Sequence, residues 1–368
     1  MHARLAATVV VFASLFLGCI DLSGMCLGGP CPPPPGPCSD ACSPQGSSEC
    51  DGSRGAMVCQ RAADGCLAPV YSECATGLLC IGTACTTTPV VWETMIVPSE
   101  TWDLSGIWGN SGSDVFAVGN VIIHYDGRTW STQASGTNAD LRLNDVWGSS
   151  SADVFAVGMA GIILHYDGVE WTPQASGTSK NLSAVWGSSS RDVFVTGDGL
   201  ILHYDGVAWS TLLAAPETEF VALWGDSPSM IFALGRGPYP TPGNRAYRYG
   251  GAAWEPMERE VWGFSLWGSS PVDVYAVGLG DPGAYHYEGQ SWTQQYLVNR
   301  GYENSAVGGT SGSNVFVVGN WGSVLRYDGS TWQTQNSGTK EILTDVWGAS
   351  ATDVFIVGFK GTVLHYKP

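Results

Sequence analysis

The amino-acid sequence predicts an all-β protein in which one unit is repeated along most of the chain. Its 368 residues include 49 glycines and 16 tryptophans, and only 13% of them are charged. Glycine supplies the positive φ angles that short turns need, so this composition is typical of many strands joined by tight turns. The repeat is the second observation: variants of VWGSSSADVFAVGMAGIILHYDGVEW recur from about residue 90 to the end of the chain.

The repeated unit has a period near forty residues. Its Trp-Gly step recurs every 38 to 43 residues, and in one unit a glycine replaces the tryptophan. The seven positions are Trp108, Trp147, Trp186, Trp224, Trp267, Gly308 and Trp347. A period of this length with several short apolar runs predicts one four-stranded blade per unit. The sequence therefore predicts a seven-bladed β-propeller over residues 90–368.

Four runs within each unit are expected to be strands, named a to d from the centre of the ring outward. Strand a reads LSAVWG in the third unit, and strands b to d read DVFAVG, GIILHYDG and VEWTPQ in the second. The runs are rich in β-branched and aromatic residues, and Gly, Ser and Asp separate them, as is typical of strands and turns.

The two ends of the repeat region indicate how the ring closes. The last unit ends at GTVLHYKP and lacks a d strand, whereas Trp92 lies 16 residues before Trp108. In the other units the matching separation is 13 to 17 residues. We therefore expect the strand around Trp92 to be the outer strand of the last blade, which protects the terminal sheet edges. The d-strand tryptophans are then Trp92, Trp130, Trp171, Trp209, Trp254, Trp292 and Trp332.

An export signal is predicted at residues 1–18. His2 and Arg4 precede an apolar run that suits a signal peptide and is too short to span a bilayer. The ending LFLGC resembles the bacterial lipobox, which implies that the Cys19 thiol carries a lipid; a plain secretory signal is the alternative. Both imply export, and we expect an outer-membrane lipoprotein facing the periplasm or the cell surface. Residues 19–37 are then a lipid-anchored, proline-rich linker.

Residues 38–89 are predicted to form a small disulfide-rich module. All eleven cysteines lie at or before Cys85, and setting Cys19 aside for the lipid leaves an even number. In an exported chain this predicts five disulfides with open connectivity. The cysteines concerned are Cys26, Cys31, Cys38, Cys42, Cys50, Cys59, Cys66, Cys74, Cys80 and Cys85. Zinc binding is disfavoured because no pair has C-x-x-C spacing and no histidine is nearby.

The motif L…VWG…DVFAVG…G.ILHYDG..W resembles the propeller repeats of the photosystem II assembly factor and its bacterial relatives, and more loosely those of the BNR/Asp-box family. It is also similar to a repeat in large uncharacterised lipoproteins of myxobacteria. The resemblance covers about three quarters of the chain and implies a propeller fold. The Asp-box places one residue between its Asp and Gly, whereas YDGRTW has none, so sialidase-like activity is not implied.

The polar residues of the repeated motif are expected to be scaffold, because a catalytic base needs one distinct set of partners. The histidines share one strand-c position, where we expect bonds to neighbouring backbone: His124, His165, His203, His286 and His365, with Arg248 and Arg326 in the other two units. The aspartates of DVF are expected to hold the a–b turn: Asp114, Asp153, Asp192, Asp273 and Asp353. Closely spaced oxygen ligands are missing from the motif, so no metal or other cofactor is expected.

Irregular segments mark the candidate binding surface, because function is expected where the repeat breaks. The b–c and d–a loops of a propeller share one face, called the top face here. In the fourth to sixth units these loops are irregular and carry Arg, Tyr and Trp, the types that dominate binding hot spots. The candidate ligand-binding residues are Arg236, Tyr239, Arg245, Arg259, Trp262, Arg300, Tyr302 and Trp321. Gly308 is expected to leave room that Trp321 occupies or borders.

These features predict a non-enzymatic cell-envelope lipoprotein whose propeller is a binding or scaffold module for a protein or a glycan. No catalytic residue is assigned. The formal net charge of −17 argues against a nucleic-acid partner, and membrane contact is expected only through the lipid. Two alternatives stay open: a glycan-active hydrolase or lyase with its site at the channel mouth, and an assembly factor for a membrane complex, as the resemblance implies.

Overall fold

The computed structural model describes most of the repeat region in full and, before it, the backbone of five short strands. The fully described ranges are 92–99, 102–137, 142–237, 244–278, 283–297 and 303–366. The predicted signal peptide, Cys19 and the linker lie outside the described residues. No helix in the described ranges has the length and hydropathy needed to cross a membrane.

The five strands of the cysteine-rich region form two small antiparallel sheets. One contains β1 (Ser48–Cys50), β2 (Gly55–Arg61) and β3 (Leu67–Glu73), and the other contains β4 (Leu79–Ile81) and β5 (Ala84–Thr86). The backbone of four predicted disulfide cysteines lies on these strands: Cys50, Cys59, Cys80 and Cys85. The other six lie outside the described residues: Cys26, Cys31, Cys38, Cys42, Cys66 and Cys74. The disulfides therefore stay a prediction.

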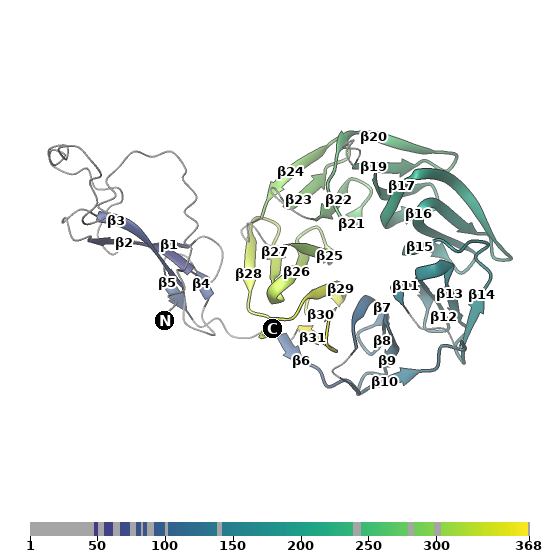
Figure 1. Ribbon diagram of the computed structural model, residues 1–368, viewed down its shortest axis with the longest axis horizontal. Helices are drawn as coiled ribbons and strands as arrows, with labels where there is room; N and C mark the ends of the chain where they lie inside the picture. Colours follow the sequence, from purple (N-terminus) through teal and green to yellow (C-terminus); the bar gives the residue numbers. More distant parts are fainter. Residues whose placement is uncertain are drawn as a thin grey trace, which may run out of the picture.

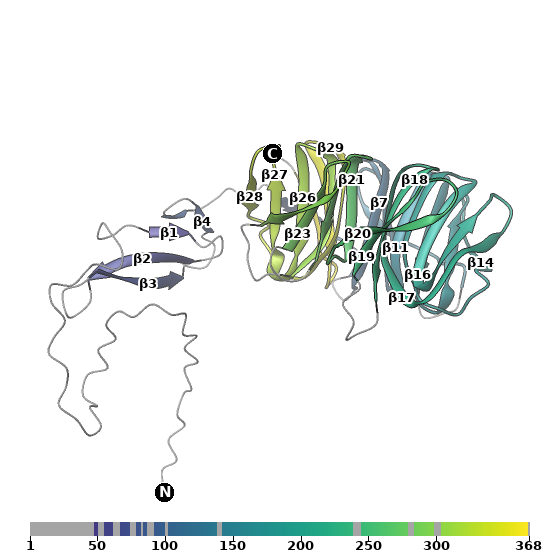
Figure 2. The same cartoon turned by 90° about the horizontal axis from the view of Figure 1, so that it is seen from above.

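Strands β6 to β31 form six antiparallel sheets arranged in a ring, which is seen face-on in Figure 1 and edge-on in Figure 2. The first contains β7 (Leu104–Ser111), β8 (Asp114–Gly119), β9 (Ile122–Tyr125) and β10 (Trp130–Gln133). The second contains β11 (Leu143–Ser150), β12 (Asp153–Gly158), β13 (Ile163–Tyr166) and β14 (Trp171–Gln174). The third contains β15 (Leu182–Ser189), β16 (Asp192–Tyr204), β17 (Trp209–Ser227), β18 (Met230–Arg236), β19 (Arg245–Tyr249) and β20 (Trp254–Glu260).

The remaining three sheets have four strands each. The fourth contains β21 (Ser265–Ser270), β22 (Asp273–Val277), β23 (Gly283–Tyr287) and β24 (Trp292–Tyr296). The fifth contains β25 (Asn304–Ser311), β26 (Asn314–Gly319), β27 (Val324–Tyr327) and β28 (Trp332–Gln335). The sixth contains β29 (Leu343–Ser350), β30 (Asp353–Gly358), β31 (Val363–Tyr366) and β6 (Trp92–Thr94).

The prediction of seven separate four-stranded blades is wrong in the number of sheets, because the third and fourth units share one. β16 continues without a break from strand b into strand c of the third unit, and β17 continues from its strand d into strand a of the fourth. Glu219 on β17 lies opposite both Asp198 on β16 and Arg236 on β18, so the ladder runs across the boundary. Seven sequence repeats therefore occupy six sheets.

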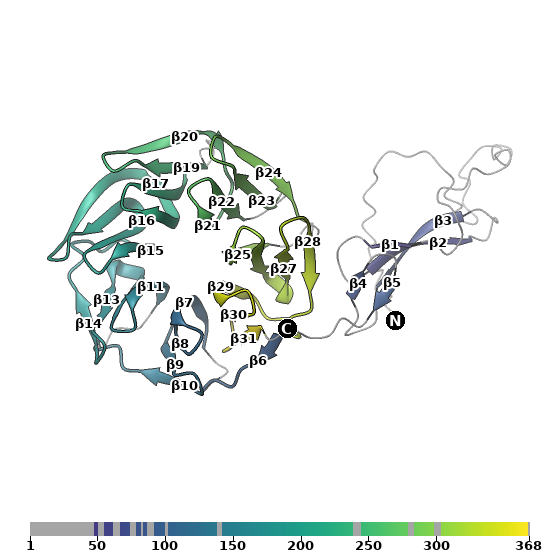
Figure 3. The same ribbon diagram turned by 180° about the vertical axis from the view of Figure 1, so that it is seen from behind.

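The outer strand of the sixth sheet comes from the start of the described propeller. β6 pairs antiparallel with β31, with Trp92 opposite Tyr366 and Thr94 opposite Leu364 (Figure 3). The Met95 N–H extends the ladder by donating to the Val363 carbonyl oxygen. Trp92 is 2% exposed and packs edge-on against Phe316 of the neighbouring sheet.

Two glycines of each repeat are explained by close packing. In every unit but the last, the glycine of the Trp-Gly step lies under the preceding unit's indole: a Cβ at Gly148 would lie 2.7 Å from Trp108, and one at Gly187 2.6 Å from Trp147. The glycine that ends DVFAVG lies against backbone, since a Cβ at Gly158 would overlap the Arg142 carbonyl oxygen. Both positions require the absence of a side chain.

Candidate functional site

Each histidine of the propeller pairs with the aspartate of its own unit. Nε2 of His165 lies 2.7 Å from Oδ1 of Asp153, and the ring stacks on Phe155 with centroids 4.4 Å apart. The pair recurs at 2.6 to 2.7 Å in His124–Asp114, His203–Asp192, His286–Asp273 and His365–Asp353. One arrangement repeated five times around the ring is a structural tie between strands rather than a single reaction centre.

The prediction that these histidines bond to neighbouring backbone is therefore wrong, since each bonds to a carboxylate. The sequence held a signal for the pairing, because the two departing units replace both members together. In the fifth sheet Arg326 replaces the histidine, and its Nε donates to Asn314 in the aspartate position at 2.8 Å. In the fourth unit Arg248 and Met230 occupy the two positions.

Replacing Asp153 by alanine is expected to lower the stability of the fold, with no separate effect on ligand binding. The carboxylate accepts hydrogen bonds from His165 and Ser149, and these bonds outweigh burial and hold the pKa of Asp153 below its usual value. Losing partners at a half-buried site costs about 1–3 kcal/mol. Urea denaturation of Asp153→Ala beside the exposed Glu170→Gln checks this; equal midpoints would contradict the structural role.

The b–c loops meet the residues that precede strand a, which defines the top face in the structure. The Met159 N–H donates to the Arg142 carbonyl oxygen and the Phe359 N–H donates to that of Ile342. Among the described residues, no three His, Cys, Asp or Glu side chains come together as a metal site.

Three of the predicted binding residues lie on neighbouring segments at the top of the third and fourth sheets. The Arg236 guanidinium lies 4.7 Å from the Phe264 ring centroid and 3.3 Å from Oε1 of Glu219. Trp262 lies two residues before Phe264 and is 46% exposed. Arg245 is exposed on β19, opposite Gly235 at the end of β18. Arg236, Arg245 and Trp262 with Phe264 are called the mouth cluster below, because Phe264 also lines the central channel.

The other predicted residues do not join this cluster in the described structure. The Arg259 Nη1 donates to the Trp292 carbonyl oxygen at 2.9 Å and so ties β20 to the outer strand of the next sheet. Trp321 is 63% exposed at the tip of a b–c loop of the fifth sheet, where its φ of 60° is unusual for a bulky residue. Tyr239, Arg300 and Tyr302 lie outside the described residues.

The expected space beside Gly308 is absent from the described structure. A Cβ at Gly308 would overlap the Val346 carbonyl oxygen of the neighbouring strand β29. The place over Gly348, where an indole lies in the other units, is taken by Thr310, whose Cγ2 would lie 2.6 Å from a Cβ there. Gly308 lies inside β25, whereas Trp321 belongs to the short 3₁₀ turn Asn320–Gly322 after β26. The prediction that Trp321 occupies or borders such a space is wrong.

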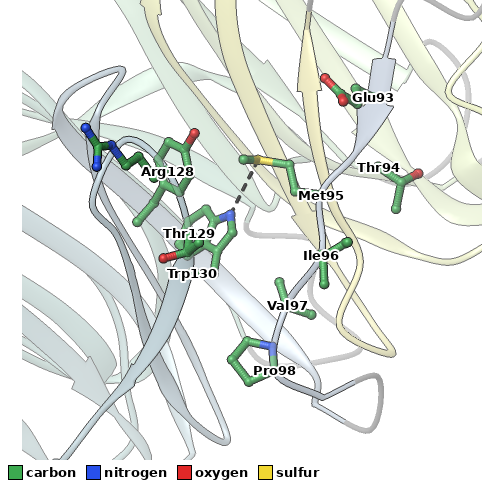
Figure 4. Close-up of a pocket in the computed structure, with 10 residues that line it drawn as sticks. Glu93, Thr94, Met95, Ile96, Val97, Pro98, Arg128, Thr129 and Trp130 are labelled. Carbon is green, nitrogen blue, oxygen red and sulfur yellow. Dashed lines mark hydrogen bonds between the residues drawn. The ribbon is translucent and has the colours of Figure 1, made fainter.

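A cavity that the sequence did not indicate lies at the outer seam between the first and sixth sheets. It has a volume of about 540 Å³ and is lined by the segment from Glu93 to Pro98 on one side and by Tyr125 and Arg128–Trp130 on the other. In Figure 4 the Trp130 indole faces Met95, and Nε1 donates to Sδ at 3.4 Å. Ile96 is 92% exposed beside it.

The innermost strands line a central channel with a volume of about 220 Å³. Among the described residues that line it, the charged ones are Asp145 and Asp345, both half-buried and at the same position of their repeats. Each carboxylate accepts two backbone N–H bonds; those to Asp145 come from Val146 and Val185, both at 2.8 Å. The matching residues in the other units are Gly106, Ala184, Ala222, Ser265 and Ala306. An aspartate in place of a small residue was the sequence signal for this pair, and it was overlooked.

Burial dominates the electrostatics of the channel. Burial raises the pKa of Asp145 to about 7, although the two N–H bonds act in the opposite direction. Burial and the nearby Asp145 carboxylate raise the pKa of Asp345 to about 8. A carboxyl group in low dielectric near a like charge disfavours ionisation, so both effects favour a proton on the pair relative to an isolated carboxyl group.

Comparisons with known proteins show similarity of fold. No family model matches the chain, and no curated protein matches it. Among solved structures, YCF48 bound to a D1 peptide is 18% identical with a TM-score of 0.62, covering 75% of this chain and 97% of that one. YCF48 from Cyanidioschyzon merolae is 16% identical with a TM-score of 0.60, covering 75% and 98%. A streptogramin B lyase is 13% identical with a TM-score of 0.62, covering 74% and 96%. The chain is an all-β propeller of antiparallel blades that shares its fold with both YCF48 and a streptogramin B lyase.

Proposed function

We propose that the chain is a non-enzymatic binding module of the cell envelope, with the propeller presenting its top face to a protein partner. The mouth cluster carries this proposal: Arg236 stacks on Phe264, which lines the channel, and the exposed Trp262 lies two residues before Phe264. Tryptophan and arginine supply most hot-spot energy in protein interfaces. A similar propeller, YCF48, has been seen with a bound peptide, which supports a protein partner over a glycan.

Crosslinking tests where a partner binds. Full-length tagged protein is crosslinked to envelope extract and the crosslinked peptides are identified by mass spectrometry. The proposal expects crosslinks on the loops around β18–β19 and Trp262, with the signal lost in Trp262→Ala and retained in Lys180→Ala. Crosslinks confined to the outer walls or to the face opposite the top face would refute the assignment.

A hydrolase or lyase is the second candidate, and the channel carboxylates are the observation that favours it. Two carboxyl groups with shifted pKa values can act as acid and base. Against this, each oxygen of Asp145 and Asp345 already accepts a backbone N–H. The five propeller histidines are also held by aspartates. Cleavage of a glycan or a streptogramin that is abolished by Asp145→Asn would establish this candidate instead.

The envelope location rests on Cys19. Replacing Cys19 by alanine is expected to move the protein from the membrane fraction to the soluble exported fraction, because a lipid chain is the only anchor proposed. Fractionation followed by immunoblotting measures this, with Cys38→Ala as the cysteine control. A wild-type protein already soluble after export would overturn the anchor and leave the binding proposal standing.

A further inference from the structure

The inner rim of the ring contains two carboxylates that bridge neighbouring sheets. Oδ2 of Asp345 on β29 accepts the Ile107 N–H of β7 at 2.9 Å, and its Oδ1 accepts the Val346 N–H at 2.8 Å. The first of these bonds crosses the seam between the sixth and first sheets, where the two ends of the propeller meet. Thr344 supports the same seam by donating to the Leu104 carbonyl oxygen at 2.7 Å.

Asp145 makes the matching bridge two seams further on. Its Oδ2 accepts the Val185 N–H across the seam between the second and third sheets. Gly106 occupies the equivalent position on β7, between the two aspartates, and a Cβ there would lie 2.9 Å from Cα of Asp145. Gly106 has no side chain, so the β7 residue at the position equivalent to the two aspartates places no side-chain atoms between them.

No cation balances the two charges within the described channel. The lining contains Ser, Asn, Thr and apolar residues besides the two aspartates. On the described strands packed against β11 and β29, the charged residues are the aspartates of the His–Asp pairs: Asp114, Asp153 and Asp353. Each of those carboxylates is turned toward its own histidine.

We propose that Asp145 and Asp345 form a proton-dependent latch on the closing seam of the propeller. With a proton on the pair, the carboxyl groups bridge β29 to β7 and β11 to β15 without mutual repulsion. When both are ionised, the repulsion across Gly106 favours opening of the seam, where water can solvate Asp345. The pairing of β6 with β31, the Thr344 bond to Leu104 and the apolar packing between the sixth and first sheets then hold the two ends of the ring.

The direction of the pH effect follows from the raised pKa values. Both lie above 3.8, the ordinary value, at about 7 for Asp145 and about 8 for Asp345. Between about pH 4 and pH 8 the folded protein keeps protons that the unfolded chain has released, so the stability contributed by the pair falls as the pH rises. The contribution is full below that window and lost above it.

Natural templates within the repeats supply the test variants. Ser265 occupies the same position in the fourth sheet and accepts the Val307 N–H at 3.2 Å, so Asp345→Ser keeps an acceptor for Ile107 without the charge. Asp145→Ala copies Ala184 and Ala222. The full chain is used, with the exposed Glu170→Gln as a charge-matched control.

Thermal unfolding and hydrogen exchange between pH 6 and pH 9 test the latch. As the pH rises, the Tm of wild type and of Glu170→Gln is expected to fall by several degrees. The equilibrium constant for opening at the β6 and β31 amides, after correction for intrinsic exchange, is expected to rise by up to about tenfold per pH unit. Asp345→Ser should abolish the pH dependence of the Tm and of the opening constant, and Asp145→Ala should make both dependences smaller. If Asp345→Ser does not fold, Asp145→Ala alone decides. A wild-type slope that the variants leave unchanged would overturn the proposal.

Discussion

Replacing Trp92 by alanine is expected to cost about 3–5 kcal/mol of unfolding free energy, the typical loss for a large buried aromatic side chain. Trp92 packs against Phe316 at 5.6 Å and Tyr366 at 5.1 Å between centroids, and so joins the fifth and sixth sheets. A loss of this size is a large share of the stability of a typical domain. Because β6 has only three residues, its pairing with β31 depends on this side chain.

Chemical denaturation measures the Trp92 effect, with Ile96→Ser as the control from the same segment. Ile96 is 92% exposed, so its replacement should leave the midpoint unchanged. Exchange of β31 amides should also become faster in Trp92→Ala. A variant that melts like wild type would show that the outer strand contributes little to holding the ring.

Replacing Gly158 by alanine is expected to cost at least about 1–3 kcal/mol, the range for overpacking a close-packed site. The added methyl group would overlap the Arg142 carbonyl oxygen and lie 2.8 Å from Cα of Leu143. These are backbone atoms, so the strand ends must separate to make room. The Met159 N–H bond to Arg142 would weaken at the same time.

Gly250 supplies the matched control for Gly158. A Cβ at Gly250 meets nothing within 4 Å, so Gly250→Ala should be neutral or slightly stabilising. Thermal unfolding of the two variants at one pH compares them directly. If Gly158→Ala is as stable as Gly250→Ala, the close approach of strands a and b does not require the motif glycine, and this explanation is wrong.

The strand pattern could be predicted from sequence because each strand satisfies a local rule. β12 reads DVFAVG and is almost entirely buried, since both of its faces pack on neighbouring sheets, whereas in the outer β14 only Trp171 is buried. The period of the Trp-Gly step located the units. The continuous β16 and β17 could not be predicted, because the repeat period does not show whether a turn breaks the ladder.

The candidate site was less predictable than the strands. The irregular loops led to Arg236, which stacks on Phe264, and to the exposed Trp262 two residues before that ring. Composition alone could not show that Arg259 is turned outward onto Trp292. Asp145 and Asp345 were passed over because each differs from its repeat neighbours by one residue inside an otherwise regular strand. Only the closed ring brings these two residues, 200 positions apart, to either side of Gly106.

The central claim is that the repeated motif is scaffold and that the mouth cluster binds. The most direct measurement is the Kd of the crosslinked partner, once identified, for full-length wild type, Arg236→Ala, Trp262→Ala and Lys180→Ala, each with its Tm. The claim predicts that binding weakens about thirtyfold or more in the Arg236 and Trp262 variants, equivalent to about 2 kcal/mol each. Trp262→Ala and Lys180→Ala should keep the wild-type Tm. Weaker binding in Lys180→Ala with unchanged binding in Trp262→Ala and Arg236→Ala would contradict it.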